Sequence, residues 1–207
     1  YEWQESNNYR NIVAKALEQG TDKVVEVRSR VEEFVAQIHT QSNFTTPPLY
    51  LPEVLRFFSF VSTQPADMMD KLSRILRVKP GVYGIQFKRG DLKPQTRMSM
   101  TRDLARIVFE GERSRFPELG TTHPGLIAFE QMIFTAGLLV PKTILLEEMA
   151  KLDSRRNVVS ELAALFWVPK SLIGFQMQDI LRSGIRPERV QTPQKSTDYG
   201  VETPVSA

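Results

Sequence analysis

The chain has 207 residues, of which 41% are hydrophobic and 25% charged, values typical of an ordinary globular protein. Its formal net charge of +3 permits contact with nucleic acid without indicating it, and no apolar run approaches the roughly 20 residues that span a bilayer. The absence of cysteines excludes a disulfide framework and a cysteine-based zinc site. With no secretory signal before the first expected helix, we expect a cytoplasmic protein that does not contact a membrane.

Two amphipathic helices are expected at the N-terminus. The first covers residues 7–19, and the second begins at Thr21. The apolar face of the second helix consists of Val24, Val27, Val31, Phe34, Val35 and Ile38. Charged residues occupy its opposite face, so we interpret it as a surface helix held by its apolar stripe, with a partner-binding helix as the alternative.

The middle of the chain is predicted to contribute a small sheet. Pro47-Pro48 indicates a loop, which is followed by a short helix over 51–58 and a short strand over 59–62. Residues 66–77 carry apolar side chains at helical spacing and are predicted to form a helix. Residues 82–87 alternate between two turn signals and are predicted to form a strand.

The stretch from Arg97 to Glu112 reads RMSMTRDLARIVFEGE and predicts an amphipathic helix that ends near Gly111. Arg102 and Arg106 are four residues apart and are therefore expected on one face of that helix. The stretch resembles the zinc-binding helix of the ImmA/IrrE family of metallopeptidases. The matching scaffold positions are Arg97, Ser99, Met100, Leu104, Ile107, Val108, Phe109, Gly111 and Glu112.

The reactive positions of that motif are changed. In H-E-x-x-H, two histidines one turn apart bind zinc and the glutamate acts as general base. The corresponding residues of this chain are Arg102, Asp103 and Arg106. The resemblance thus retains the scaffold of the zinc helix without its metal ligands.

A second segment carries the same resemblance. A loop from Ser114 to Gly125 precedes a helix expected over 126–137, and residues 134–141 read FTAGLLVP, similar to the family segment F-A-A-x-L-L-M-P. The resemblance places the family's third metal ligand, a glutamate, at Ala128. Glu130 is near in sequence but about 200° further round the helix.

After a further helix from Lys142, residues 157–181 resemble the family's C-terminal helical pair and also a helix-turn-helix. A DNA reader presents arginine, asparagine or glutamine at the start of its second helix. Here that start is Lys170-Ser171-Leu172-Ile173, so packing against the core is the favoured interpretation. Residues 183–207 lack apolar periodicity and are predicted to form a flexible tail.

The resemblance implies an α+β fold: a helix-rich, zincin-like metallopeptidase domain with a small β-sheet, plus a C-terminal helical pair. The expected organisation is N-terminal helices over 1–40, the metallopeptidase-like core over 41–155, the helix-turn-helix-like pair over 156–182 and the flexible tail over 183–207.

The family implies a zinc peptidase, but we expect neither a metal nor another cofactor here. The chain has two histidines, and the alternative set of His123 with Asp103 and Glu130 is poor beside two histidines and a glutamate. At about 4 Å and an effective dielectric constant of about 20, each of Arg102 and Arg106 would oppose a bound cation by several kcal/mol. The arginine pair forms either an internal salt-bridge cluster, which we favour, or a site for an acidic side chain or phosphate.

The sequence therefore favours a catalytically inactive metallopeptidase-fold protein that acts in regulation or assembly by binding another protein, with a DNA-bound regulator as one candidate partner. One alternative is a divergent active metallopeptidase that cleaves a repressor-type regulatory protein. Another is a DNA-binding transcriptional regulator that uses the helical pair over 157–181. Arg102, Asp103, Arg106 and Ala128 are the positions on which these hypotheses differ.

Overall fold

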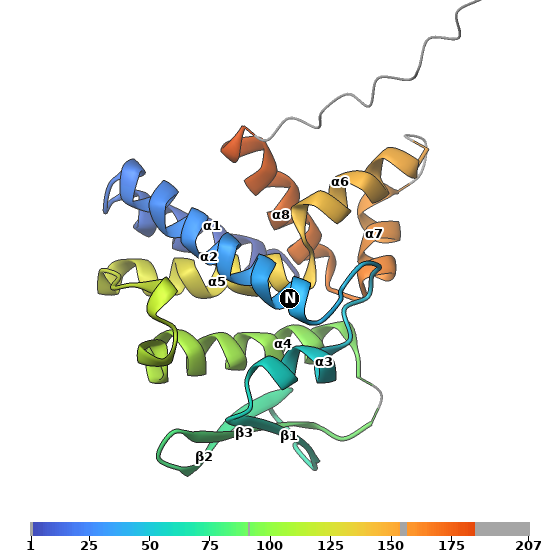
Figure 1. Cartoon of the computed structure of the whole chain (residues 1–207). Coiled ribbons are helices and arrows are strands. Elements are labelled where there is room, and N and C mark those ends of the chain that lie inside the picture. The colour runs from blue at the N-terminus through green and yellow to red at the C-terminus, as the bar shows by residue number, and fades with distance from the viewer. Residues whose placement is uncertain (1, 91, 154–156, 185–207) are drawn as a thin grey trace, which may run out of the picture.

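The computed structural model describes residues 2–90, 92–153 and 157–184, which form a helical body with a small sheet at one end (Figure 1). The fold is α+β, as the sequence predicts. Its α-helices are, in chain order, α1 (Glu2–Leu17), α2 (Thr21–Gln41), α3 (Leu51–Phe57), α4 (Pro94–Arg106), α5 (Ile127–Leu139), α6 (Lys142–Lys151), α7 (Val158–Phe166) and α8 (Lys170–Ser183).

The sheet has the strand order β1-β3-β2, in which β1 (Val61–Ala66) runs parallel to β3 and β2 (Ser73–Lys79) runs antiparallel to it. The strand β3 (Val82–Lys88) confirms the strand expected over 82–87. The strand expected over 59–62 is confirmed in part, since β1 begins at Val61. Because β3 is central, β2 is an edge strand, and it packs against α4. The sheet as a whole lies below α4 in Figure 1.

The helix expected over 66–77 is wrong. Its second half is strand β2, in which Ile75 lies opposite Ile85 of β3. The apolar residues of this segment fit a helical spacing, but Ile75, Leu76 and Val78 also suit a strand. The backbone groups of β2 pair with β3, and this pairing across the sheet overrides a local periodicity that a short apolar run does not specify uniquely.

Two helices run through the centre of the molecule, and their contact forms the core. Helix α4 lies beside α5, and it continues through a π-helical turn, η1 (Ile107–Gly111) (Figure 1). The fully buried Phe134 of α5 stacks on Phe34 of α2 at 6.0 Å and meets Phe109 of η1 edge-on at 5.4 Å between ring centroids. Aromatic packing of this kind fixes α2, α4 and α5 against one another.

The N-terminal helices cover the other side of α5. Every member of the apolar face predicted for α2 is buried, so its interpretation as a helix held by that stripe is confirmed. The first helix begins earlier than residue 7, at Glu2. Helix α1 contacts both α5 and α8, so the two ends of the described chain meet on the same body.

The C-terminal helical pair is present and bends by 109° between α7 and α8. Trp167 makes this turn in the left-handed region at φ 54°, and its indole Nε1 donates to the carbonyl of Leu92 at 2.8 Å. Ser171, Leu172 and Ile173, at the start of α8, are buried, as expected for a pair that packs against the core. Residues 185–207 of the predicted tail lie outside the described residues.

In the part of the chain that the structure describes, no single helix combines the length and apolar character required to cross a membrane. Two bent pairs, residues 124–139 with 142–151 and α7 with α8, reach that length and composition only when they are taken together.

Candidate functional site

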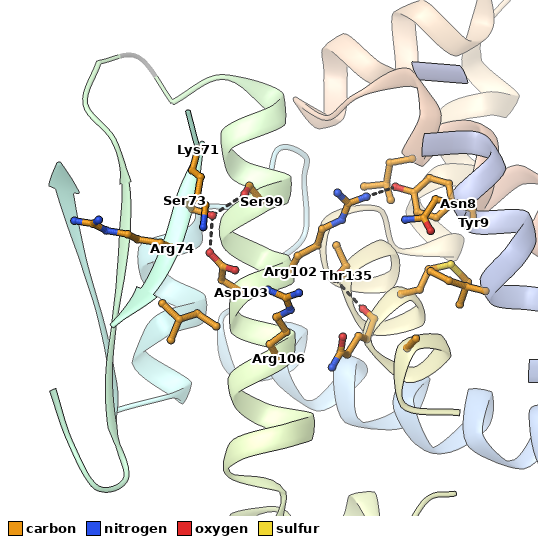
Figure 2. A pocket seen from close by; sticks show the side chains of 16 residues that line it. Asn8, Tyr9, Lys71, Ser73, Arg74, Ser99, Arg102, Asp103, Arg106 and Thr135 are labelled. Atoms are coloured by element: carbon orange, nitrogen blue, oxygen red, sulfur yellow. Dashed lines mark hydrogen bonds between the residues drawn. The ribbon is translucent and has the colours of Figure 1, made fainter. Parts of the chain in front are cut away.

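The four positions singled out by the metallopeptidase resemblance line one cavity of about 690 Å³, shown in Figure 2. Arg102, Asp103 and Arg106 come from α4, and Ala128 comes from the first turn of α5. We call this space the motif cavity. The other side chains that line it are Asn8, Tyr9, Ile12, Lys71, Ser73, Arg74, Ile75, Ser99, Gln131, Met132, Thr135 and Leu172.

The sequence of α4 explains why these side chains face the cavity. The helix begins with Pro94, whose fixed φ suits a first helical position. Its apolar positions, such as Leu104 and Ala105, are buried on other faces. Arg102 and Arg106 are one turn apart, so both remain at the cavity side of the helix.

Arg102 joins three helices at one wall of the cavity. Its Nη2 donates to the hydroxyl of Tyr9 at 3.1 Å, and its Nη1 lies 3.4 Å from Oε1 of Glu5. The second carboxylate oxygen of Glu5 accepts from Ser171 Oγ of α8 at 2.8 Å. Burial raises the pKa of Tyr9 and the charge of Arg102 opposes this, so the phenol stays neutral and hydrogen-bonded at neutral pH.

Asp103 points to the opposite wall, toward the sheet (Figure 2). Its Oδ2 accepts from Ser73 Oγ of β2 at 2.6 Å, and that hydroxyl lies 2.6 Å from Ser99 Oγ. Burial raises the pKa of Asp103, while the Ser73 hydrogen bond and the charges of Arg106 and Lys71 act to lower it. The carboxylate is therefore held by β2, in surroundings that disfavour its charge.

Arg106 and Lys71 are cations that face this cavity without a direct partner. Both are exposed, and within the described residues neither has a hydrogen bond or an ion pair shorter than 4.0 Å. Their interaction with Asp103 is a longer-range Coulombic attraction, without a hydrogen bond. Arg74 also lines the cavity, but its guanidinium extends away from α4 (Figure 2), where its Nε donates to Gln86 on β3 at 2.6 Å.

The residues present do not fit a zinc ion. The guanidinium groups of Arg102 and Arg106 offer no lone pair, and Ala128 offers no donor atom. Nowhere in residues 2–90, 92–153 and 157–184 do three or more His, Cys, Asp or Glu side chains gather closely enough to hold a metal ion. No step of a metal-dependent reaction is therefore assigned to this cavity.

The alternative set of His123, Asp103 and Glu130 is not assembled. His123 Nδ1 accepts from the backbone N–H of Gly125, at the start of the 3-10 turn η4 (Pro124–Leu126). Glu130 is fully buried, where it forms a bidentate ion pair with Arg113. Among the described residues these three side chains do not converge, so the set that the sequence analysis judged poor for zinc is not formed.

Sequence reasoning missed Tyr9, Lys71 and Ser73 as cavity residues. Tyr9 reaches Arg102 over 93 residues of sequence, and Ser73 reaches Asp103 over 30. Ser73 and Lys71 were missed because residues 66–77 were predicted to form a helix, whereas Ser73 begins strand β2. Ser73, Arg74 and Ile75 alternate as a strand facing α4 would, but three residues are too few to decide against the helical spacing of the same segment.

The chain was compared with protein-family models and with curated proteins. No protein-family model matches the chain, and no curated protein is significantly similar to it. The resemblance to metallopeptidases therefore stays a prediction from the sequence of α4, α5 and the C-terminal helical pair.

The raised pKa of Asp103 gives a prediction about stability. Because the folded state holds this proton more tightly than the unfolded chain, the contribution of Asp103 to stability is greatest below its ordinary pKa of 3.8 and is lost as the pH rises through the raised value. We expect Asp103→Asn to raise the melting temperature at neutral pH, with a gain that disappears in acid. Thermal unfolding monitored by circular dichroism over a pH series measures this.

The matched control is Asp67→Asn, because the side chain of Asp67 is 85% exposed in its ion pair with Arg89. That change should leave the melting temperature nearly unaltered at every pH. A destabilised Asp103→Asn variant at neutral pH would show instead that the charge of Asp103 supports the fold.

Proposed function

We propose that this protein is a catalytically inactive relative of the ImmA/IrrE metallopeptidases, which acts in regulation or assembly by binding another protein. The observation that carries this proposal is the motif cavity itself. Arg102, Asp103 and Arg106 of α4 and Ala128 of α5 line one space of about 690 Å³, although none of them forms part of a metal site among the described residues. A cytoplasmic location belongs to the same proposal, because the chain has no cysteines.

The order of elements supports the family part of the proposal. A strand, β3, precedes the motif helix α4, and α5 follows with the FTAGLLVP segment and then the helical pair of α7 and α8. The sheet lies on one side of α4 and α5 lies on the other (Figure 1). This is the order of segments that the resemblance implies.

The chemistry of the side chains supports the absence of catalysis. Zinc hydrolysis requires three protein ligands, an open position for water and a nearby base. Arg102 and Arg106 bring fixed positive charge to the ligand positions, and Ala128 brings no donor. Asp103 is engaged by Ser73, and without a metal-bound water it has no nucleophile to activate. What remains is an open cavity lined by both polar and apolar side chains, which is suited to binding.

The DNA-reading alternative lacks a supporting observation. Of the four residues at the start of α8 that would have to enter a groove of DNA, Lys170 is exposed, but Ser171, Leu172 and Ile173 are buried against the body. Further along the helix, Gln176 donates from Nε2 to the carbonyl of Val140 at 2.6 Å, and the fully buried Asp179 pairs with Arg28. The face of α8 that would contact bases in a helix-turn-helix is therefore packed against the rest of the protein.

Restoring the zinc ligands tests the family part. We expect the fourfold variant Arg102→His, Asp103→Glu, Arg106→His and Ala128→Glu to bind zinc stoichiometrically, whereas the unaltered protein does not. The control carries Ala128→Gln with the other three changes, because glutamine lacks the carboxylate that serves as third ligand. Its affinity for zinc should be weaker by about tenfold or more. Elemental analysis after zinc loading and competition with a chromogenic chelator measure both.

Two results would overturn the proposal. A folded fourfold variant that binds zinc no better than its glutamine control would reject the zincin-like placement of Ala128. Stoichiometric zinc in the unaltered protein, with chelator-sensitive cleavage of a co-expressed partner, would reject inactivity. The proposal instead predicts that a partner recovered with the protein has its full-length mass, measured by intact mass spectrometry.

A further inference from the structure

The charges around the motif cavity are unbalanced. Four cations line it: Arg102 and Arg106 from α4, Lys71 from the segment before β2, and Arg74 of β2, whose guanidinium bonds Gln86. Asp103 is the single carboxylate among the lining side chains. Arg102 is already shared with Glu5 and Tyr9. Arg106 and Lys71 therefore remain available, and their charge is offset only by one acid that is hydrogen-bonded to Ser73.

A second hollow continues this positive surface. It has a volume of about 380 Å³ and shares Lys71 with the motif cavity. Lys88 and Lys93 also line it, and neither forms an ion pair with a described residue, whereas Asp70 is its one acidic side chain. At its edge Met69 is 94% exposed, which offers an apolar contact beside the lysines.

We propose that the motif cavity and the second hollow together bind an extended, acidic segment of the partner protein, with Arg106 and Lys71 receiving its anionic groups. This inference rests on the proposed function, since it names the chemistry of the partner that the inactive cavity binds. Carboxylate side chains and phosphorylated side chains share the required chemistry, because both accept charge-assisted hydrogen bonds from guanidinium and ammonium groups.

The shape of the site favours a peptide over other anions. A single small anion would occupy one position, but the cations extend over two adjoining hollows joined at Lys71. Duplex DNA binds projecting helices or ribbons that enter a groove. The Asp103 side of this surface is instead recessed between the sheet and α4 (Figure 2). An extended segment several residues long can follow such a path.

Fluorescence anisotropy with defined probes tests the inference on the whole protein. The probes are a labelled peptide of alternating glutamate and alanine, the same peptide with glutamine in place of glutamate, and the same peptide with phosphoserine in that place. We expect the glutamate or phosphoserine peptide to bind and the glutamine peptide not to bind. The stronger of the two acidic probes identifies the anionic group, and added salt should weaken its binding.

Substitutions locate the binding. The double variant Lys71→Gln and Arg106→Gln should weaken acidic-peptide binding by about tenfold or more, since each change removes a charge-assisted hydrogen bond. The matched control is Lys15→Gln with Lys23→Gln, which removes the same charge from exposed positions on α1 and α2 and should change affinity by less than about twofold. Asp103→Asn should tighten binding by about threefold, because it removes the opposing carboxylate.

The tightening by Asp103→Asn is a gain that an unfolded variant cannot produce. The inference is overturned if the control double variant weakens binding as much as the cavity variant does. It is also overturned if inorganic phosphate or duplex DNA binds while no acidic peptide does, or if Asp103→Asn leaves the affinity unchanged. In those cases zinc restoration and the intact partner mass still decide the proposed function separately.

Discussion

Replacing Arg97 with leucine is expected to lower the free energy of unfolding by about 3–5 kcal/mol. Arg97 is only 4% exposed, yet its guanidinium holds three chain segments together. Its Nη1 donates to the carbonyls of Phe166 at 3.0 Å and Trp167 at 2.7 Å, and its Nη2 donates to the carbonyl of Leu49 at 2.6 Å. Leucine would leave these carbonyls without their donor.

The guanidinium is specifically required at this position. Burial lowers the pKa of Arg97 to about 10, so the group still carries its charge at neutral pH. Arg97→Lys should cost less than Arg97→Leu, because an ammonium keeps a charged donor but lacks the planar fork that serves three carbonyls. Arg10→Leu, at an exposed position of α1, should change stability by less than about 0.5 kcal/mol. Urea denaturation measures all three.

A loss below about 1 kcal/mol for Arg97→Leu would contradict this account. It would mean that water or a rearranged turn at Trp167 replaces the lost donors. The result bears on the site as well, because Arg97 lies on the same helix as Arg102 and ties that helix to the turn before α8.

The local pattern of apolar and polar residues was sufficient to predict most of the helices and the central strand. The apolar stripe of α2 and the alternation over 82–87 each specify one face of one element, and both predictions are confirmed. Strand β2 was not predictable in this way. Its apolar residues fit two periodicities, and the choice between them is made by pairing with β3 and by the contact of Ser73 with α4.

The candidate site was predictable only along α4. The spacing of Arg102 and Arg106 places them on one face whatever surrounds the helix. The partners of Arg102, Tyr9 and Glu5, come from α1, and the partner of Asp103, Ser73, comes from β2. Because these segments are distant in sequence, no local signal identifies the pairs. The same holds for buried charges such as Asp179, which pairs with Arg28 across 151 residues of sequence.

Buried charge also fixes helix α8, which supplies one wall of the motif cavity through Leu172. Asp179 of α8 is fully buried. Its Oδ1 lies 2.8 Å from Nη2 of Arg28 on α2, and its Oδ2 lies 2.7 Å from Nζ of Lys142 on α6. One carboxylate thus joins three helices, and Lys142 extends the network to Glu32.

Asp179→Ala is expected to destabilise the protein by about 3–5 kcal/mol, because it leaves the largely buried charge of Arg28 without its acid and leaves Lys142 with Glu32 alone. The triple variant Asp179→Leu, Arg28→Met and Lys142→Met should recover most of that loss, since apolar side chains of similar volume need no compensating charge. Guanidinium denaturation of the single, double and triple variants gives the coupling between the three sites. If the losses simply add, the three side chains stabilise the protein independently and do not act as one network.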